Sequence, residues 1–317
     1  MILKTLFIIR QRMTFRPPLF SISEGPDGWK NYLANEGYVV ITDILTSREQ
    51  ETILETFKHE FSQVSPNFSF SDPATWTIEN TPAMFGKGMA TYNGFGQSDF
   101  MWSLRTHSNI QAPFKELFKT SSLVSSLDGF SIFVSKKQKS KSWLHIDQNP
   151  KNDIYSIQGA YNLFQVDQHD AGFVVVPKSH KSFRPEFKGK ADWHVVDQET
   201  FQHKAVKLLI PKNCLTLWNS RLVHANAGML PDSRETTINR ITAYISFQPK
   251  DNRPEKIKEA REKAYLNGKT TSHWSNRCEL KTYPFGFKTR YESRGFNTLK
   301  PRLTHDNKIP CERLELL

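Results

Sequence analysis

Apolar positions between residues 28 and 64 follow the spacing of a helix, then of a strand, then of a helix again. The stretch "GWKNYLANEG" (28–37) has helical periodicity and ends at a glycine, and "YVVITDIL" (38–45) is the continuous apolar run of a buried strand. Thr46 and Glu49 then stand in capping-box spacing ahead of a second amphipathic run. The pattern predicts two helices on either side of one strand.

Short apolar runs separated by turn residues dominate the middle of the chain. They predict strands at 129–135, 142–147, 154–164, 172–177, 206–210, 214–218, 221–225 and 240–248. Many short strands joined by turns are typical of a sandwich or a jelly roll. We therefore expect a mainly β fold of one of these two kinds with flanking helices, including a short helix near 110–119 and a solvated helix in "RPEKIKEAREKAYLNG" (253–268).

A long irregular segment, residues 65–103, precedes these strands. It is rich in glycine and proline, and its rings include Trp76, Phe85, Tyr92, Phe95 and Trp102. A loop of this length commonly covers a site. Two interpretations stay open: a local hydrophobic cluster, and a lid that encloses a small, partly apolar substrate.

The net charge of +11 is concentrated at the two ends of the chain. Residues 1–30 carry a net charge of +3 and residues 251–317 carry +6, which leaves about +2 for the 220 residues between them. A nucleic-acid-binding groove would concentrate the excess on one surface of the domain, so nucleic acid is not an expected partner. No run approaches the ~20 apolar residues of a membrane span, so no membrane partner is expected either.

Cysteine usage indicates the compartment. The three cysteines, at positions 214, 278 and 311, are odd in number and widely spaced, which fits a reducing compartment better than a disulfide framework. We therefore expect an intracellular, cytoplasmic protein. The first 16 residues contain basic side chains and no acid, which keeps a mitochondrial presequence as the alternative.

Candidate metal chemistry begins at "WLHIDQNP" (143–150). His145 and Asp147 are two residues apart, so a strand would project both side chains from one face. An imidazole and a carboxylate supply two ligands for a divalent metal. A second histidine would complete a 2-His-1-carboxylate set, which leaves positions open for cosubstrate, substrate and dioxygen. His224 in "LTLWNSRLVHANAG" (215–228) ends an apolar strand pair and is the candidate.

A further group is needed if the reaction consumes a dicarboxylate. The stretch "NRITAYISF" (239–247) starts a strand with Arg240, and Thr242 lies two residues on, hence on the same face. A guanidinium fork and a hydroxyl together can hold a carboxylate. Arg234 is a rival for this role, but it lies in the polar loop "PDSRETT" (231–237) and not at the start of a strand.

Together these stretches resemble the phytanoyl-CoA dioxygenase-like family of iron(II)/2-oxoglutarate-dependent oxygenases. The matching segments are "WLHIDQNP", "IQGAYNLFQVDQHDAGFVVVPKSH" (157–180), "LWNSRLVHANAG" (217–228) and "NRITAYISF". The resemblance implies a double-stranded β-helix (a cupin-like jelly roll) over residues 28–275. A basic extension, residues 1–27, would precede this domain, and a polar basic extension, residues 276–317, would follow it.

Carried over by position, the resemblance also implies the residues of the site. His145, Asp147 and His224 match the catalytic metal ligands, with iron(II) as the metal. Arg240 matches the residue that grips the distal carboxylate of 2-oxoglutarate, and Thr242 fits as its hydroxyl partner.

Three more residues follow the first motif along the chain. Gln158, Tyr161 and Asn162 are expected to face the cosubstrate or the substrate. The implied activity is hydroxylation of a small molecule at carbon, with dioxygen and 2-oxoglutarate consumed and succinate and carbon dioxide released. Asp147 occupies the position that halogenating enzymes of this fold leave free for halide, which favours hydroxylation or desaturation. The alternative is a non-catalytic jelly-roll binding module that keeps the metal site.

Overall fold

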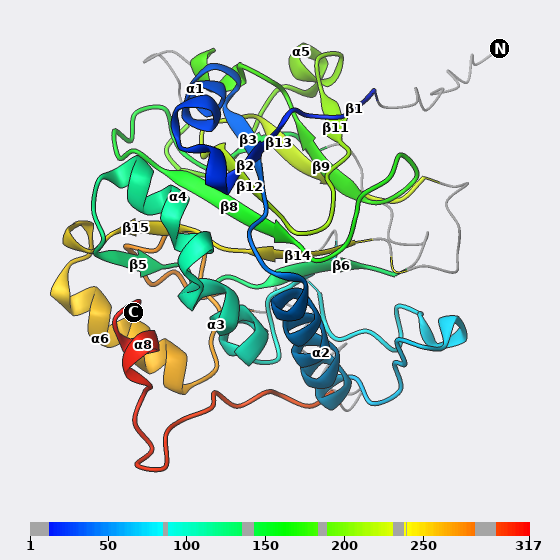
Figure 1. Cartoon of the computed structure of the whole chain (residues 1–317), viewed down its shortest axis with the longest axis vertical. Helices are drawn as coiled ribbons and strands as arrows, with labels where there is room; N and C mark the ends of the chain where they lie inside the picture. The colour runs from blue at the N-terminus through cyan, green and yellow to red at the C-terminus, as the bar shows by residue number, and fades with distance from the viewer. Residues whose placement is uncertain are drawn as a thin grey trace.

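In the computed structural model, two β-sheets face each other and helices cover the outer side of one of them (Figure 1). The structure describes residues 13–84, 88–134, 143–182, 189–230, 238, 240–282 and 296–317. The architecture is the expected mainly β jelly roll with flanking helices.

The first sheet, which we call sheet A, contains the two candidate metal-binding histidines. Its strands, in spatial order, are β1 (Thr14–Phe15), β11 (Val206–Leu208), β9 (Gly172–Val175), β13 (His224–Ala227), β7 (His145–Ile146) and β10 (His194–Val195). All pairings within it are antiparallel except that of β1 with β11.

The second sheet, sheet B, lies between sheet A and the main helical layer. Its strands, in spatial order, are β2 (Leu19–Ser21), β3 (Tyr38–Thr42), β12 (Cys214–Asn219), β8 (Ile157–Asn162), β14 (Arg240–Tyr244), β6 (Phe130–Phe133) and β4 (Met89–Ala90). A separate antiparallel pair joins β5 (Leu123–Ser125) to β15 (Phe247–Pro249).

Alternation along each strand of sheet B separates two environments. On β8, Ala160 packs with Phe173 and Val175 of sheet A, whereas Ile157 and Tyr161 belong to the large apolar core on the helical side. The space between the sheets therefore receives every second side chain of each central strand, and the polar ones among them form the candidate site.

The helices α2, α3 and α4 lie on the outer side of sheet B and α6 lies near the β5–β15 pair (Figure 1), and all four contribute apolar side chains to the large core on this side. On α2, Phe57 packs edge-on against Phe130 of β6, with ring centroids 5.2 Å apart. The helices are α1 (Asp27–Glu36), α2 (Ser47–Val64), α3 (Asp99–Thr106), α4 (Ser108–Phe118), α5 (Gln198–Gln202), α6 (Glu255–Leu266) and α8 (Cys311–Leu314). None of the described helices is long and apolar enough to cross a membrane.

The predicted start of α2 is confirmed. The Glu49 carboxylate accepts the Thr46 N–H at 2.8 Å, and the Glu49 N–H donates to the Thr46 hydroxyl at 3.3 Å, which completes the capping box. The glycine stop before the first long strand is confirmed as well, because Gly37 ends α1 in the left-handed region with φ 85°.

Each of the eight runs predicted between 129 and 248 contains a strand, with ends shifted by a few residues. The shortest of them, β7, covers only His145–Ile146, so that Asp147 follows the strand and is not part of it.

Residues on both sides of the expected 28–275 domain contact the jelly roll. β1 and β2 extend sheets A and B, and Leu316 and Leu317 are buried in the core on the helical side. The division of the chain at 27/28 and 275/276 stays a prediction.

Gly159 on β8 offers a test of the packing between sheet B and α4. A Cβ at this position would lie 2.5 Å from the carbonyl oxygen of Ile245 and 2.9 Å from the ring of Phe114. Gly159→Ala should therefore lower the free energy of unfolding by about 1–3 kcal/mol in urea denaturation, because the backbone or the helix must shift. Gly28→Ala on exposed α1 is the control, since its Cβ meets only side-chain atoms of Phe20 at 3.4 Å. Equal stability of the two variants would contradict this packing.

Candidate active site

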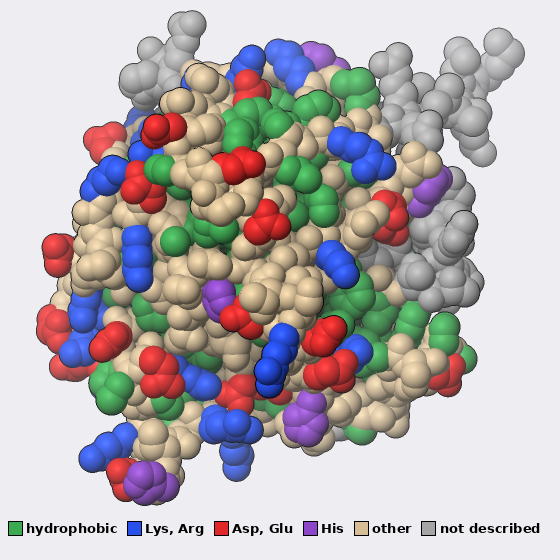
Figure 2. All heavy atoms as spheres, viewed as in Figure 1, with side chains coloured by type: hydrophobic (Ala, Val, Ile, Leu, Met, Phe, Trp, Pro, Cys, Tyr) green, Lys and Arg blue, Asp and Glu red, His purple; other side chains and the backbone are tan. Residues whose placement is uncertain are grey.

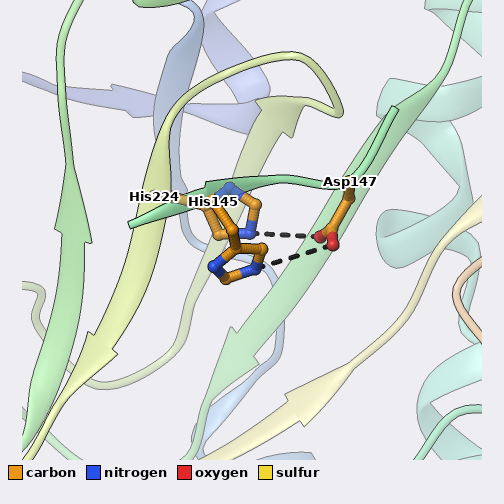
Figure 3. Close-up of side chains that lie close together, drawn as sticks. All are labelled: His145, Asp147 and His224. Atoms are coloured by element: carbon orange, nitrogen blue, oxygen red, sulfur yellow. Dashed lines mark ion pairs between the residues drawn. The ribbon is translucent and has the colours of Figure 1, made fainter. Parts of the chain in front are cut away.

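Two histidines from neighbouring strands meet in the space between the sheets. His224 of β13 and His145 of β7 are direct partners in the antiparallel register, and their ring centroids lie 4.3 Å apart. Both side chains are buried. Figure 3 shows the two rings side by side and pointing toward Asp147.

The Asp147 carboxylate completes the group immediately after β7. Its Oδ1 lies 3.6 Å from Nε2 of His145, and its Oδ2 lies 3.1 Å from Nε2 of His224 (Figure 3). One ligand atom from each of the three residues lies within 4.8 Å of the others. Ligands about 2.0–2.2 Å from a shared metal are about 3 Å apart, so a small inward movement brings these atoms into coordination range.

Hydrogen bonds orient each of the three groups. Nδ1 of His145 donates to the carbonyl of Trp143 at 2.9 Å, and Nδ1 of His224 donates to the carbonyl of Leu222 at 2.8 Å. Because a carbonyl only accepts, the proton sits on Nδ1 and the lone pair of Nε2 faces the centre, as a metal requires. The Gln158 amide donates to Oδ2 of Asp147 at 2.9 Å and fixes the carboxylate.

Electrostatics keep the Asp147 carboxyl ionised. Burial by itself raises its pKa, but in the metal-free protein the charge of a protonated His145, and the hydrogen bond and charge of a protonated His224, oppose burial; the neutral rings with free Nε2 lone pairs are the form that binds a metal. The pKa of Asp147 therefore lies well below its ordinary value. Two imidazoles and one ionised carboxylate form the donor set of a non-haem iron(II) centre.

Arg240 begins β14 and is buried between the sheets. Its Nε donates to the Thr242 hydroxyl at 2.9 Å, and its Nη1 donates to Oδ1 of Asn226 at 2.8 Å. Within the described residues no carboxylate pairs with this guanidinium. A buried cation without a counter-ion is costly, so the arrangement fits a site that receives a carboxylate from a ligand.

The residues predicted on β8 divide between the two faces of sheet B. Gln158 and Asn162 point between the sheets, where Gln158 contacts Asp147 and Asn162 accepts from the Thr242 hydroxyl at 3.3 Å. Tyr161 is a correction: it lies on the helical side, and its hydroxyl donates to Asn213 at 3.0 Å. Side chains alternate along a strand, so an odd-numbered residue cannot share the face of positions 158 and 162.

The triad lines a cavity of about 180 Å³. The other polar and charged residues of its wall are Thr91, Asp128, Gln158, Asn226, His273, Lys281 and Thr282, and its apolar and aromatic residues are Met89, Tyr92, Trp143, Phe173, Trp193, Trp218 and Tyr244. Arg240 is not part of this wall, but Asn226 connects it to the wall. The Asn226 amide also donates to the Tyr244 hydroxyl at 2.7 Å.

Only part of the long segment at 65–103 reaches the cavity. Tyr92 lines it, while Trp76, Phe95 and Trp102 pack into or against the core on the helical side. Phe85 and Arg234 lie outside the described residues.

Two kinds of cavity residue were missed by sequence reasoning. Asn226 and Tyr244 could have been found, since they follow His224 and Thr242 by the two-residue spacing that identified the other inward-facing positions. The segment 270–282, which brings His273 and Lys281 to the cavity, carries no such signal.

No family model matches the chain. Its sequence is 24% identical over 282 residues to "Ava biosynthesis cluster protein O" of Aspergillus versicolor, covering 81% of this chain and 89% of that protein. It is 22% identical over 239 residues to "Putative phytanoyl-CoA dioxygenase" of Dictyostelium discoideum, covering 60% and 67% of the two chains. Among solved structures, iron-bound EctD from S. alaskensis has the same fold, with a TM-score of 0.50 and 16% identity over 77% of this chain and 85% of that one.

Two histidines and one carboxylate are the donor set typical of the non-haem iron(II)/2-oxoglutarate-dependent oxygenases as a class, and the fold of the chain is that of iron-bound EctD. With the two relatives, they confirm the resemblance of the chain to the phytanoyl-CoA dioxygenase-like family. Iron(II), 2-oxoglutarate and dioxygen are the cofactor and cosubstrates of this class.

The buried Asp128 carboxyl in the cavity wall should make the stability of the protein depend on pH. Burial raises the pKa of its carboxyl from 3.8 to about 6, although Lys281 and the Gly129 N–H favour the ionised form. The folded protein therefore binds a proton more tightly than the unfolded chain, and this contribution to stability is lost as the pH rises from about 4 through about 6.

Asp128→Asn should remove the buried charge and raise the free energy of unfolding by about 1–3 kcal/mol at about pH 8. Urea denaturation at several pH values measures the effect, and the gain should shrink toward about pH 4. Asp251→Asn on the exposed surface is the matched control and should show no such trend. A gain that does not change with pH would contradict the assignment.

Proposed function

We propose that the protein is a 2-oxoglutarate-dependent dioxygenase that hydroxylates a small molecule at carbon. The observation that carries this proposal is the convergence of two oriented imidazoles and one ionised carboxylate in the wall of a cavity. Asp147 fills the position that a halogenating enzyme of this fold would leave to halide, which supports hydroxylation or the related desaturation.

His145, Asp147 and His224 would hold the iron. Bound iron supplies the activation of dioxygen, coupled to oxidative decarboxylation of 2-oxoglutarate to succinate and carbon dioxide. The protein contributes orientation: the carbonyls of Trp143 and Leu222 fix the two rings, and Gln158 fixes the carboxylate. The three residues lie in the cavity wall, so a metal that they held would be open to cosubstrate, substrate and dioxygen from the cavity.

Arg240 would bind the distal carboxylate of 2-oxoglutarate. Its Nε and Nη1 are already held by Thr242 and Asn226, so the guanidinium is oriented before the ligand arrives. Among the described residues, no carboxylate pairs with the Arg240 guanidinium, which supports its role in binding a carboxylate of the ligand. Asn226 and Tyr244, hydrogen-bonded to each other at the cavity wall, would contact the same ligand.

A small substrate is supported by the size of the cavity, which at about 180 Å³ is below the ~300–1,000 Å³ of pockets for drug-sized ligands. On the face that Figure 2 shows, Lys and Arg are mixed with Asp and Glu, so this face has no continuous basic patch for a polyanion.

Product analysis with labelled dioxygen tests the activity. The protein loaded with iron(II) and 2-oxoglutarate should release succinate when a small-molecule fraction is supplied, and mass spectrometry should find one labelled oxygen in a small product. His224→Ala should lose iron binding and reduce succinate formation by orders of magnitude, because water cannot replace the lost ligand without disturbing the triad. Label in a protein side chain or a nucleobase, chloride in a small product, or iron binding without any succinate would contradict the proposal.

Arg240→Ala should raise the KM for 2-oxoglutarate by about 100-fold, which corresponds to the loss of a buried charge-assisted pair worth about 3 kcal/mol. Iron binding, measured by calorimetry, should remain. Arg234→Ala removes a charge of the same kind and should change the KM little. The reverse ranking of the two variants would show that the wrong arginine has been chosen.

A further inference from the structure

The cavity has a second set of polar groups that the proposed reaction does not use. Asp128, His273 and Lys281 line the same cavity as the triad, but none of them contacts a predicted metal ligand through a hydrogen bond or ion pair within the described residues. They come from two segments far apart in the sequence, the loop between β5 and β6 and the segment 270–282.

Asp128 is buried and rigidly held. Only 7% of its surface is exposed, and Oδ1 accepts the Gly129 N–H at 2.8 Å. The Asp128 carbonyl accepts from buried Arg105 at 2.6 Å. Gly129 has no space for a side chain, since a Cβ would lie 2.1 Å from the carbonyl oxygen of Ala90. The backbone thus fixes the direction of this carboxylate.

The second segment is fastened beside the first. The Thr271 N–H donates to the carbonyl of Leu127 at 3.0 Å, and the Thr271 hydroxyl accepts the Leu127 N–H at 3.3 Å. Thr271 also forms an antiparallel bridge with Leu280, which precedes Lys281. Within the cavity wall, the Tyr92 hydroxyl donates to the carbonyl of Thr282 at 3.1 Å. These hydrogen bonds hold the segment 270–282 in place as part of the cavity wall.

Asp128 has no counter-ion at contact distance among the described residues. Within the part of the chain that the structure describes, no Lys, Arg or His nitrogen lies within ion-pair range of its carboxylate, and the cation that most favours its ionised form is exposed Lys281. A neutral hydrogen-bond donor would leave this buried charge uncompensated, whereas a cationic ligand would neutralise it.

The rest of the cavity suits a cation with an organic body. Tyr92, Trp143, Trp193 and Trp218 present aromatic rings to the same space. Aromatic faces attract ammonium groups and pack against apolar carbon. In addition, Nε2 of His273 is buried and, among the described residues, has no hydrogen-bond partner.

We propose that Asp128 forms a substrate subsite for a protonated amine, so that the small molecule oxidised at the triad is an organic amine. The statement that the amine is oxidised rests on the proposed function. The statement that an amine binds rests only on the residues of the cavity. The positive charge of Lys281, which lines the same cavity, should then lower the affinity of the subsite for a cation. The two residues should therefore act with opposite signs.

The probe is benzylammonium, with benzyl alcohol and benzoate as neutral and anionic analogues. Protein loaded with metal and 2-oxoglutarate is titrated without oxygen, and binding is followed by tryptophan fluorescence and calorimetry at about pH 7.5, where Asp128 is largely ionised. Benzylammonium should bind more tightly than either analogue. Asp128→Asn should weaken it by about tenfold or more, and Lys281→Met should tighten it several-fold. Asp251→Asn controls for the change in net charge.

Benzoate binding more tightly than benzylammonium, unchanged affinity in Asp128→Asn, or weaker binding in Lys281→Met would each overturn the subsite.

His224→Ala separates this proposal from the proposed oxygenase activity. It should lose iron and succinate formation yet still bind benzylammonium through Asp128. Turnover that survives in His224→Ala refutes the metal assignment alone, whereas an unchanged affinity of Asp128→Asn for benzylammonium refutes the subsite alone.

Discussion

The register between β7 and β13 is the constraint on which the site depends. His145 and His224 stand directly opposite each other in this antiparallel pair, so their side chains share one face of sheet A. A slip of one residue in either strand would turn one imidazole away from the space between the sheets. The carbonyls of Trp143 and Leu222, each two residues before a histidine, then set both rings with the same geometry. Strand pairing therefore determines the donor set before any metal is present.

The jelly roll separates the residues that stabilise it from those that act. The outer face of sheet B and the helices share a large apolar core, in which Phe57 packs against several aromatic rings. The space between the sheets instead contains the charges of buried Asp128 and Arg240 and of Asp147, whose side chain is 13% exposed. Each of these charges is costly unless a partner compensates it, so the helical side must supply stability that the polar side lacks.

Local periodicity predicted most of the strands of this fold, because inward-facing strand positions recur every second residue, whereas the set His145, Asp147 and His224 was implied by the family resemblance, since Asp147 follows β7 and is not part of it. The same rule explains the error at Tyr161. Neighbouring residues on a strand point to opposite faces, so Tyr161 cannot face the same side of sheet B as Asn162. Asp128 and the segment around Thr271 could not be predicted this way. Their place beside the triad depends on backbone pairing between distant segments, which leaves no periodic signal in either stretch. Capping chemistry, in contrast, is local and was predicted in full at the start of α2.

The central claim is that His145, Asp147 and His224 hold one iron ion between the sheets. Anomalous diffraction at the iron edge, from crystals grown with iron(II) and 2-oxoglutarate without oxygen, tests it most directly. The account predicts a single strong peak about 2.0–2.2 Å from Nε2 of both histidines and from the carboxylate of Asp147. An iron peak at other residues, with these three side chains uncoordinated, would contradict it.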